Sequence, residues 1–381
     1  KEYVIYEQPY WWSDKWDFRD YWKDFNFDRP FFEQWWELLK TTPIPCLFTE
    51  YTKDVNSAFT NFAGYDKNCY LIFHADMNED CYYATGLKKS KRCVDSLNVF
   101  DSELTYECIN CKNCYDIKYS QDCNNCTESW FLRNCFGCKN CFGCMNLINS
   151  EYHLFNKKVT PEEYEQFIKE FESGKHNIME LLKEKYANFS EGEIHRVFQG
   201  LRNERCSGDH IFDCKDVTES FDIQESRDMK FCQRIYNWPN SDCHDVDQFG
   251  LRIRKVYESA NVWVDCENVI ASLYSYNLIN TAYSIFSFNC EDCFGCVWVH
   301  RWKYCIFNKE YSKDEYFALK AKIIEHMKQT WEWGEFFPAS LTPFGYNETV
   351  AQEYYPLSEE EILSHSELDS ESFESQNVNP K

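Results

Sequence analysis

The residues with the most reactive side chains are cysteines, of which the sequence has 22. Many are separated by two residues, a spacing that zinc sites use for pairs of thiolate ligands. These pairs and runs are Cys108/Cys111, Cys123/Cys126, Cys135/Cys138, Cys141/Cys144 and Cys290/Cys293/Cys296. The best candidate metal ligands are Cys290, Cys293, Cys296, His300 and Cys305. The spacing alone therefore suggests zinc or an iron–sulfur centre.

A longer pattern gives the same spacing a structural explanation. All 12 cysteines from Cys69 to Cys144 lie at positions that are multiples of three. Other residues in this frame are small or apolar: Ser57, Thr60, Ala63, Ile72, Ala75, Ala84, Ser96, Ser102, Ile117, Ser120, Ser129 and Leu147. Their common property is limited volume rather than affinity for metal. The frame therefore predicts side chains that point into a narrow interior.

We accordingly expect buried structural thiols, which behave as small inert hydrophobic groups. We expect no cofactor, and zinc, an iron–sulfur centre and disulfides are the alternatives. Thiols three residues apart on one coil rarely have the Cβ geometry of a disulfide. Many free thiols are typical of a reducing compartment, so the expected location is cytoplasmic.

The elements that position these side chains must repeat every three residues. Regular β-strands repeat every two residues, and bundled polyproline helices need more than the 12 glycines present. We therefore expect a β-solenoid made of short strands joined by frequent corners. A cut every 21 residues aligns Ile72, Cys93, Cys114 and Cys135, which predicts coils of about 21 residues.

Asn or Asp often precedes an inward cysteine. The examples are Asn68, Asp80, Asn113, Asp122, Asn125, Asn134 and Asn140. These residue types tolerate the left-handed backbone conformation, so we expect them at the corners of the coils. Stacked corners would place their side chains in ladders.

The second half of the chain repeats the first. Asn140-Cys-Phe-Gly-Cys144 recurs 152 residues later as Asp292-Cys-Phe-Gly-Cys296. In each half a capping box follows, Thr160-Pro-Glu-Glu163 and Ser312-Lys-Asp-Glu315, and predicts the start of a helix. Each helix is expected to cap an open solenoid end. Between residues 236 and 259 the triplet frame slips, which predicts a bulge or loop.

The expected fold is mainly β, with two tandem β-solenoid (β-helix) arrays, each followed by a capping α-helix. The tryptophan-rich N-terminal segment is expected to pack on the first coil. The predicted parts are an aromatic N-terminal segment (1–47), a first β-solenoid (48–158), a helical connector (159–205), a second β-solenoid (206–311), a C-terminal helix and clamp (312–356) and an acidic disordered tail (357–381).

The composition limits the classes of partner. The net charge of −23 opposes binding to nucleic acid and to anionic membranes, and favours a protein partner with basic character. No apolar run approaches the roughly 20 residues of a membrane helix. Together with the regular faces, this predicts a non-catalytic scaffold or protein-binding module.

The alternatives are an enzyme and a nucleic-acid mimic. A polysaccharide-directed enzyme on a β-helix face would use paired carboxylates, but the acids are simply abundant: Asp213, Asp216, Asp242, Asp245, Asp247 and Asp265. His244 beside Cys243 is not expected to form a nucleophile pair, because adjacent side chains diverge. An acidic mimic of nucleic acid, binding a basic protein, would need columns of acids, and the acids are dispersed. The chain is thus more readily understood as a binding protein than as an enzyme.

Several stretches carry a family resemblance. They are Trp11-Trp-Ser-Asp-Lys-Trp16, Asp28-Arg-Pro-Phe-Phe-Glu-Gln34, Lys67-Asn-Cys-Tyr-Leu-Ile-Phe73, the two Cys-Phe-Gly-Cys segments, Trp333-Gly-Glu-Phe-Phe-Pro338 and residues 342–357. They resemble an uncharacterised cysteine-rich family from candidate phyla radiation bacteria, sometimes labelled as CaiB/BaiF-type CoA-transferases. That label implies α/β elements that this sequence lacks. The resemblance implies flanking zinc-ribbon modules, the first of which would end where this chain starts, and no activity.

Overall fold

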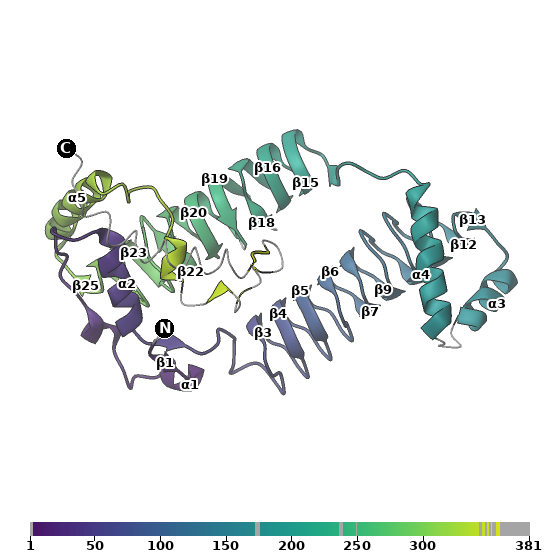
Figure 1. Cartoon of the computed structure of the whole chain (residues 1–381), viewed down its shortest axis with the longest axis horizontal. Coiled ribbons are helices and arrows are strands. Elements are labelled where there is room, and N and C mark those ends of the chain that lie inside the picture. The colour runs from purple at the N-terminus through teal and green to yellow at the C-terminus, as the bar shows by residue number, and fades with distance from the viewer. Residues whose placement is uncertain are drawn as a thin grey trace. The chain divides into compact units, whose positions relative to one another are not determined.

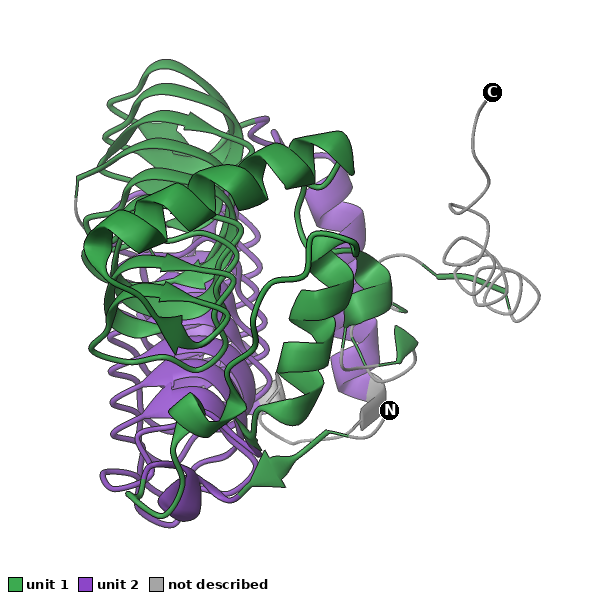
Figure 2. Cartoon of the chain, turned by 90° about the vertical axis from the view of Figure 1, so that its left-hand side faces the viewer, with its two compact units in different colours: residues 1–6, 13–44, 198–381 green, residues 7–12, 45–197 purple. Residues whose placement is uncertain are grey.

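The computed structural model describes residues 3–171, 176–235, 239–248, 250–342, 345, 346, 349, 352 and 356–358. The predicted acidic tail, 357–381, lies outside the described residues apart from Leu357 and Ser358. The chain forms two compact units (Figure 2). Unit 1 comprises residues 1–6, 13–44 and 198–381, and unit 2 comprises residues 7–12 and 45–197. None of the described helices is long and apolar enough to cross a membrane.

Unit 2 is built mainly from short parallel strands in stacked coils (Figure 1). The strands are β3 (Asn61–Gly64), β4 (Tyr70–Asp76), β5 (Tyr82–Lys88), β6 (Leu97–Phe100), β7 (Glu103–Tyr106), β8 (Ile109–Lys112), β9 (Tyr115–Lys118), β10 (Thr127–Trp130), β11 (Lys139–Phe142), β12 (Glu151–Leu154) and β13 (Lys157–Lys158). They form sheets of order β3-β4-β5-β6-β8 and β13-β12-β11-β10-β9-β7. The predicted β-solenoid is therefore confirmed.

The predicted coil length of 21 residues is wrong, because from Val55 onward the coils of unit 2 have twelve, after a first bridge from Thr49 to Ala63 that spans fourteen. Thr127 pairs with Tyr115 on one side and Lys139 on the other, twelve residues away in both directions. Both 21 and 12 are multiples of three. An alignment of residues 21 apart therefore matches inward residues with inward residues, but it matches residues from different sides of the coil. At a coil spacing of about 4.8 Å, residues 48–152 form a stack of roughly 40 Å rather than about 24 Å.

The period of three comes from the backbone. Every third residue along the coils has a positive φ close to +50°, for example Asn68 (+55°), Leu71 (+50°) and His74 (+51°). Each such residue turns the chain, and four turns close one coil of twelve residues. The Asn and Asp residues predicted at corners all have this conformation. Their side chains also form the expected ladders, as between Asn68 and Asp80, where the amide donates across 3.1 Å.

The inward side chains form hydrogen bonds with backbone N–H and C=O groups that have no partner in the sheets. The backbone N–H of Cys141 points inward and donates to the Ser129 hydroxyl of the preceding coil at 3.0 Å. That hydroxyl in turn donates to the carbonyl of Thr127 at 2.7 Å. Cysteine takes the same place elsewhere: the N–H of Asn156 donates to Cys144 Sγ at 3.4 Å, and this thiol donates to the Phe142 carbonyl at 3.3 Å. Serine and cysteine therefore interchange in the frame because both are small and can accept and donate at once.

Replacing Ser129 tests this explanation. Ser129→Ala should lower the free energy of unfolding by about 1–3 kcal/mol, because the buried N–H of Cys141 loses its acceptor. Ser129→Cys should lower it by less, since sulfur still accepts and donates. Urea denaturation of the two variants would measure the difference. Equal losses would show that volume alone decides which residues occupy the frame.

Unit 1 contains a second series of parallel strands. They are β14 (Gly200–Leu201), β15 (Glu204–Phe212), β16 (Lys215–Gln224), β17 (Ser226–Lys230), β18 (Gln233–Ile235), β19 (Asn240–Asp247), β20 (Arg254–Val262), β21 (Glu267–Ile270), β22 (Leu273–Ile279), β23 (Phe288–Phe294), β24 (Lys303–Ile306) and β25 (Lys309–Glu310). They belong to one sheet.

The predicted slip of the triplet frame is present in unit 1. Met229 pairs with Cys243, fourteen residues on, and Cys243 pairs with Val256, thirteen residues on. The coil then returns to twelve residues where Leu278 pairs with Cys290. The extra residues explain why one frame could not fit this half of the chain. Trp238, which the sequence placed in the slip, lies outside the described residues.

A hairpin and a helix follow the last parallel strand of each unit. β13 turns back antiparallel on β12, and β25 on β24. Phe155 and Asn156 both have positive φ, as two-residue hairpin turns require. Helices α3 (Pro161–Phe171) and α5 (Lys313–Gln329) then begin at the predicted capping boxes. In the second box, Ser312 and Glu315 each bond the other's backbone N–H.

The N-terminal aromatic segment was expected to pack on the first coil, and only residues 7–12 do so: they belong to unit 2, where Gln8 hydrogen-bonds Thr49. Residues 13–44 belong to unit 1 instead. Phe31 opens helix α2 (Phe31–Thr41), and its ring centroid lies 5.5 Å from Phe294 and 5.3 Å from Phe307. The error arose because proximity in sequence was taken for proximity in space. The remaining short elements are β1 (Ile5–Tyr6), α1 (Gln8–Trp11), η1 (Phe18–Tyr21), β2 (Ile44–Pro45), α4 (His176–Glu191) and η2 (Ala339–Leu341).

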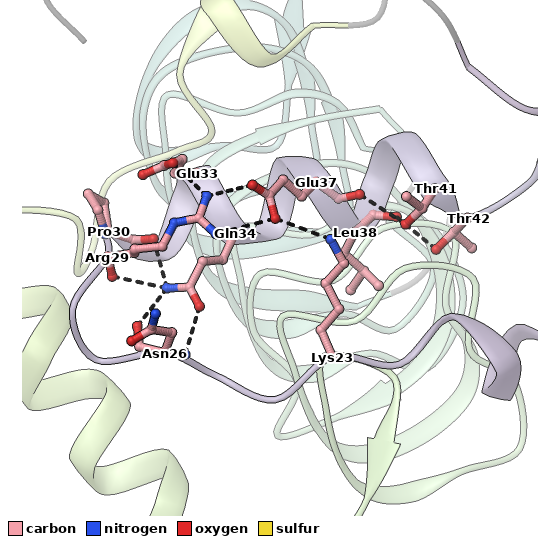
Figure 3. Close-up of polar contacts among 10 residues, drawn as sticks. All are labelled: Lys23, Asn26, Arg29, Pro30, Glu33, Gln34, Glu37, Leu38, Thr41 and Thr42. Carbon is pink, nitrogen blue, oxygen red and sulfur yellow. Dashed lines mark hydrogen bonds and ion pairs between the residues drawn. The ribbon is translucent and has the colours of Figure 1, made fainter. Parts of the chain in front are cut away.

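Polar contacts hold the loop that leads into α2 (Figure 3). Gln34 accepts the backbone N–H of Asn26 at 2.8 Å and donates to the Asn26 and Pro30 carbonyls at 2.9 and 3.1 Å. Arg29 bridges Glu33 and Glu37 at 2.5 Å each. These contacts fix the turn before the helix and so the direction in which Phe31 enters the packed aromatic cluster.

Candidate functional site

The cysteines proposed as metal ligands lie in the interior of unit 1. Cys290, Cys293 and Cys296 are successive inward residues, and Cys305 pairs with Cys293 from the next coil. All four are at most 2% exposed. His300 falls outside the inward frame, and its ring packs 4.9 Å from that of Phe18. The structure therefore brings the four thiols together without the histidine.

The thiols act as hydrogen-bond donors to backbone carbonyls. Cys290 Sγ donates to Phe288 and Val299 at 3.3 Å each, and Cys296 Sγ donates to Phe294 at 3.5 Å. Within the described ranges, no group of three or more His, Cys, Asp or Glu side chains has an arrangement that could hold a metal ion.

The same positions recur in unit 2, where the sequence pattern had indicated the equivalence of Cys141 and Cys144 but not that of His153. Cys138, Cys141 and Cys144 correspond to the three unit 1 cysteines at the 152-residue repeat, and His153 corresponds to Cys305. His153 pairs with Cys141. The signal is the 152-residue repeat itself, which places His153 in the inward frame at the position of Cys305.

Burial suppresses the reactivity of the isolated interior thiols. It raises the pKa of Cys214 and Cys232 to about 11, and that of Cys243 and Cys266 to about 12. Thiolates are the reactive form, so these residues are inert near neutral pH. Cys243 is buried while His244 is exposed, which agrees with the expectation that the two do not form a nucleophile pair.

Thiol titration checks this arrangement. Cys46 is exposed, Cys206 is half-buried, and the other 20 cysteines are buried and free. We expect one or two thiols to react with Ellman's reagent in the native protein, and 22 after unfolding in guanidinium. Fewer than 22 after unfolding would reveal disulfides, and bound zinc measured on the same sample would reveal metal ligation. Many fast-reacting thiols in the native protein would contradict the dry interior.

Three of the six unit 1 carboxylates that were candidates for hydrolysis, Asp213, Asp216 and Asp265, form ion pairs with arginines on the surface. Arg202 hydrogen-bonds Asp213 and lowers its pKa, and Arg252 does the same for Asp265. Asp213 also lines a hollow with Lys215, Glu225 and Arg227. A carboxylate held ionised in this way cannot serve as the general acid of a glycosidase. Asp247, whose pKa is raised by burial, is not among the residues that line this hollow.

The most distinctive surface of unit 2 is a line of aromatic residues. Parallel pairing stacks Ala58, Tyr70, Tyr82, Val94, Tyr106, Lys118, Trp130 and Phe142 in successive coils. The residue after each of these adds a second row. We call the aromatic members of both rows the aromatic strip: Phe59, Tyr70, Tyr82, Tyr83, Tyr106, Tyr119, Trp130, Phe131 and Phe142.

Helices α3 and α4 cover one end of the aromatic strip (Figure 1). Phe167 of α3 lies 4.8 Å from Phe142, and Tyr186 of α4 lies 5.5 Å from Phe131, measured between ring centroids. Phe131 stacks in turn on Tyr119 at 4.7 Å. Apolar helix residues therefore complete the packing of the strip at its C-terminal end.

The other end of the aromatic strip is exposed. Phe59 is 65% exposed, Tyr83 56% and Tyr82 37%. Phe59 and Tyr83 both pack edge-on against Tyr70, at 5.5 and 5.8 Å. A contiguous patch of large apolar side chains on a folded surface commonly marks an interaction site.

Comparisons with known proteins add no function. No family model and no curated protein matches the sequence. A solved structure described as an acetyltransferase from Desulfovibrio desulfuricans G20 matches at 7% identity and a TM-score of 0.14, over 70% of this chain and 69% of that one. This likeness supports no argument about fold or activity. The fold itself defines a β-solenoid protein with stacked coils.

Proposed function

We propose that the chain is a non-catalytic scaffold that binds a protein partner through its outer faces. The exposed half of the aromatic strip is the observation that carries the proposal, since Phe59, Tyr82 and Tyr83 leave a large apolar area in water. In the described coils, inward side chains fill the interior of each unit, so the outer faces are where a partner can bind. The cytoplasmic location expected from the free thiols belongs to the same proposal.

We further propose that the two strand series are tandem solenoids, each closed by its own helix. The recurrence of the hairpin, the capping box and the helix in both units supports this arrangement. Tyr164 and Tyr316 occupy equivalent positions in the two helices, and both are buried. The acidic-mimic alternative is weaker, because bridges such as Arg205–Asp216 and Arg254–Glu267 neutralise acids across adjacent coils.

Comparative affinity capture tests the binding function. The full chain and the double variant Phe59→Ser/Tyr83→Ser serve as baits in a lysate of the source organism. Ile148→Ser is the matched control, because Ile148 is 63% exposed but lies outside the strip. We expect proteins retained by the wild type and the control to be lost with the double variant. Retention of the same proteins by all three baits, or of none, would refute binding through this surface.

A further inference from the structure

The aromatic strip binds helices wherever it is covered. In unit 2 the covering helices are α3 and α4. In unit 1, repeat-equivalent residues Tyr283 and Phe294 contact Phe31 of α2 at 5.2 and 5.5 Å. The exposed half of the aromatic strip continues the rows that α4 covers in unit 2. An α-helix is therefore a suitable occupant for it as well.

Lysines accompany the helices at this surface. Lys183 of α4 places its ammonium group 5.2 Å from the Tyr119 ring, and Lys185 lies 4.4 Å from Phe155. In unit 1, Lys320 of α5 lies 5.7 Å from Phe294. Cations over aromatic faces are attracted by the ring quadrupole, more strongly where water is excluded.

Two carboxylates mark the border between the covered and exposed halves. Asp95 and Glu107 follow Val94 and Tyr106 in the stacked rows, and both are exposed. The Tyr106 hydroxyl donates a hydrogen bond to the Glu107 carboxylate, and this bond raises the pKa of the tyrosine. In the second row these acids lie between Tyr83 and Tyr119, beside the exposed half of the aromatic strip, which favours positive charge in the partner.

We propose that the exposed half of the aromatic strip, with Asp95 and Glu107, binds a basic amphipathic α-helix of a partner protein. This inference rests on the proposed binding function and specifies the partner. The helix would place apolar residues at three- and four-residue spacing on Phe59, Tyr82 and Tyr83. Its lysines or arginines would face the two carboxylates.

A pair of synthetic peptides tests the specificity. Both carry the apolar residues of α4 at their native spacing, those of Ile178, Met179, Leu182, Tyr186 and Phe189. The remaining positions are Ala and Lys in one peptide, and Ala and Glu in the other. We expect fluorescence anisotropy with the full chain to show saturable binding of the lysine peptide, and binding of the glutamate peptide at least about tenfold weaker, or 1.4 kcal/mol.

Variants of the full chain identify the surface. The double variant Phe59→Ser/Tyr83→Ser should weaken binding of the lysine peptide at least about tenfold. Ile148→Ser should leave its affinity unchanged. Asp95→Lys/Glu107→Lys should reverse the preference between peptides. All these residues are exposed, so thermal unfolding should match that of the wild type, which shows that the variants are folded.

The outcomes separate the two proposals. Equal binding of both peptides, or binding insensitive to the strip variants, overturns the basic-helix partner. If lysate capture still depends on Phe59 and Tyr83 but the lysine peptide does not bind, the surface binds protein of another kind and only this inference fails. If sedimentation shows a dimer that Phe59→Ser/Tyr83→Ser dissociates, the occupant is a second copy of the chain, and the inference is again wrong.

Discussion

Replacing Glu332 by alanine should lower the free energy of unfolding by about 3 kcal/mol, which makes it one of the most damaging single substitutions outside the coils. Glu332 is 8% exposed, and its two carboxylate oxygens accept the backbone N–H groups of Phe31 and Phe32 at 2.8 and 2.7 Å. These N–H groups open helix α2 and have no partner within the helix. The carboxylate also compensates the positive end of the helix dipole.

Denaturant unfolding followed by tryptophan fluorescence would measure this loss. Glu335→Ala is the matched control, because Glu335 is exposed three residues away. The loss in free energy of unfolding for Glu332→Gln should lie between those of the two alanine variants, since the amide keeps one acceptor oxygen but loses the charge. If Glu332→Ala were no more destabilising than Glu335→Ala, the carboxylate would not be what holds α2 to the C-terminal segment.

Replacing Asp66 by asparagine should instead stabilise the protein, by up to about 3 kcal/mol above pH 7. Asp66 is 1% exposed, and desolvation by burial raises its pKa from 3.8 to about 6. One oxygen accepts the backbone N–H and the side-chain amide of Asn78, and the other has no hydrogen-bond partner in the described structure. Asparagine removes the buried charge and keeps the accepting oxygen.

The pH dependence has a definite sign. The folded pKa of Asp66 exceeds the unfolded value of 3.8, so the folded state binds the proton more tightly. The contribution of Asp66 is therefore most favourable below pH 4, weakens as pH rises through the interval from 4 to 6, and stays at its least favourable level above that interval. Burial also raises the pKa of Asp54 and Asp76, so the informative quantity is the difference between wild type and Asp66→Asn.

Urea denaturation at several pH values would measure that difference. It should be small near pH 4 and grow until about pH 7. Asp101→Asn, which removes the same charge at an exposed corner, should show no such growth. A stabilisation by Asp66→Asn that did not vary with pH would mean that the carboxylate is not desolvated as its burial indicates.

Local rules predicted the repeating unit well. The inward frame of Cys69 to Cys144, the corner residues such as Asn68, and the start of α5 at Ser312 all depend on residues within a few positions of one another. The coil length was missed because cysteine marks only some inward positions. The pairing of Tyr115 with Thr127 depends on which triplets stack, and that is decided by closure of the whole coil.

The candidate site was less predictable because it depends on distant parts of the chain. Glu332 meets the N–H of Phe31 across 301 residues, and no local pattern connects a glutamate in the C-terminal segment to that helix. The aromatic strip is invisible until the twelve-residue register is known, since only that register aligns Tyr70, Tyr82 and Tyr106. Phe59 and Tyr83 are exposed because α3 and α4 cover only the other end of the aromatic strip.

The left-handed corner at every third residue has a consequence for how such a chain can change in length. A stretch of twelve residues can be added or deleted without shifting the backbone register of the neighbouring coils, because each coil presents the same four corners to the next. Any other change must be absorbed locally, as the coils of thirteen and fourteen residues between Met229 and Val256 do. Insertions and deletions between related chains should therefore mostly be whole coils of twelve residues.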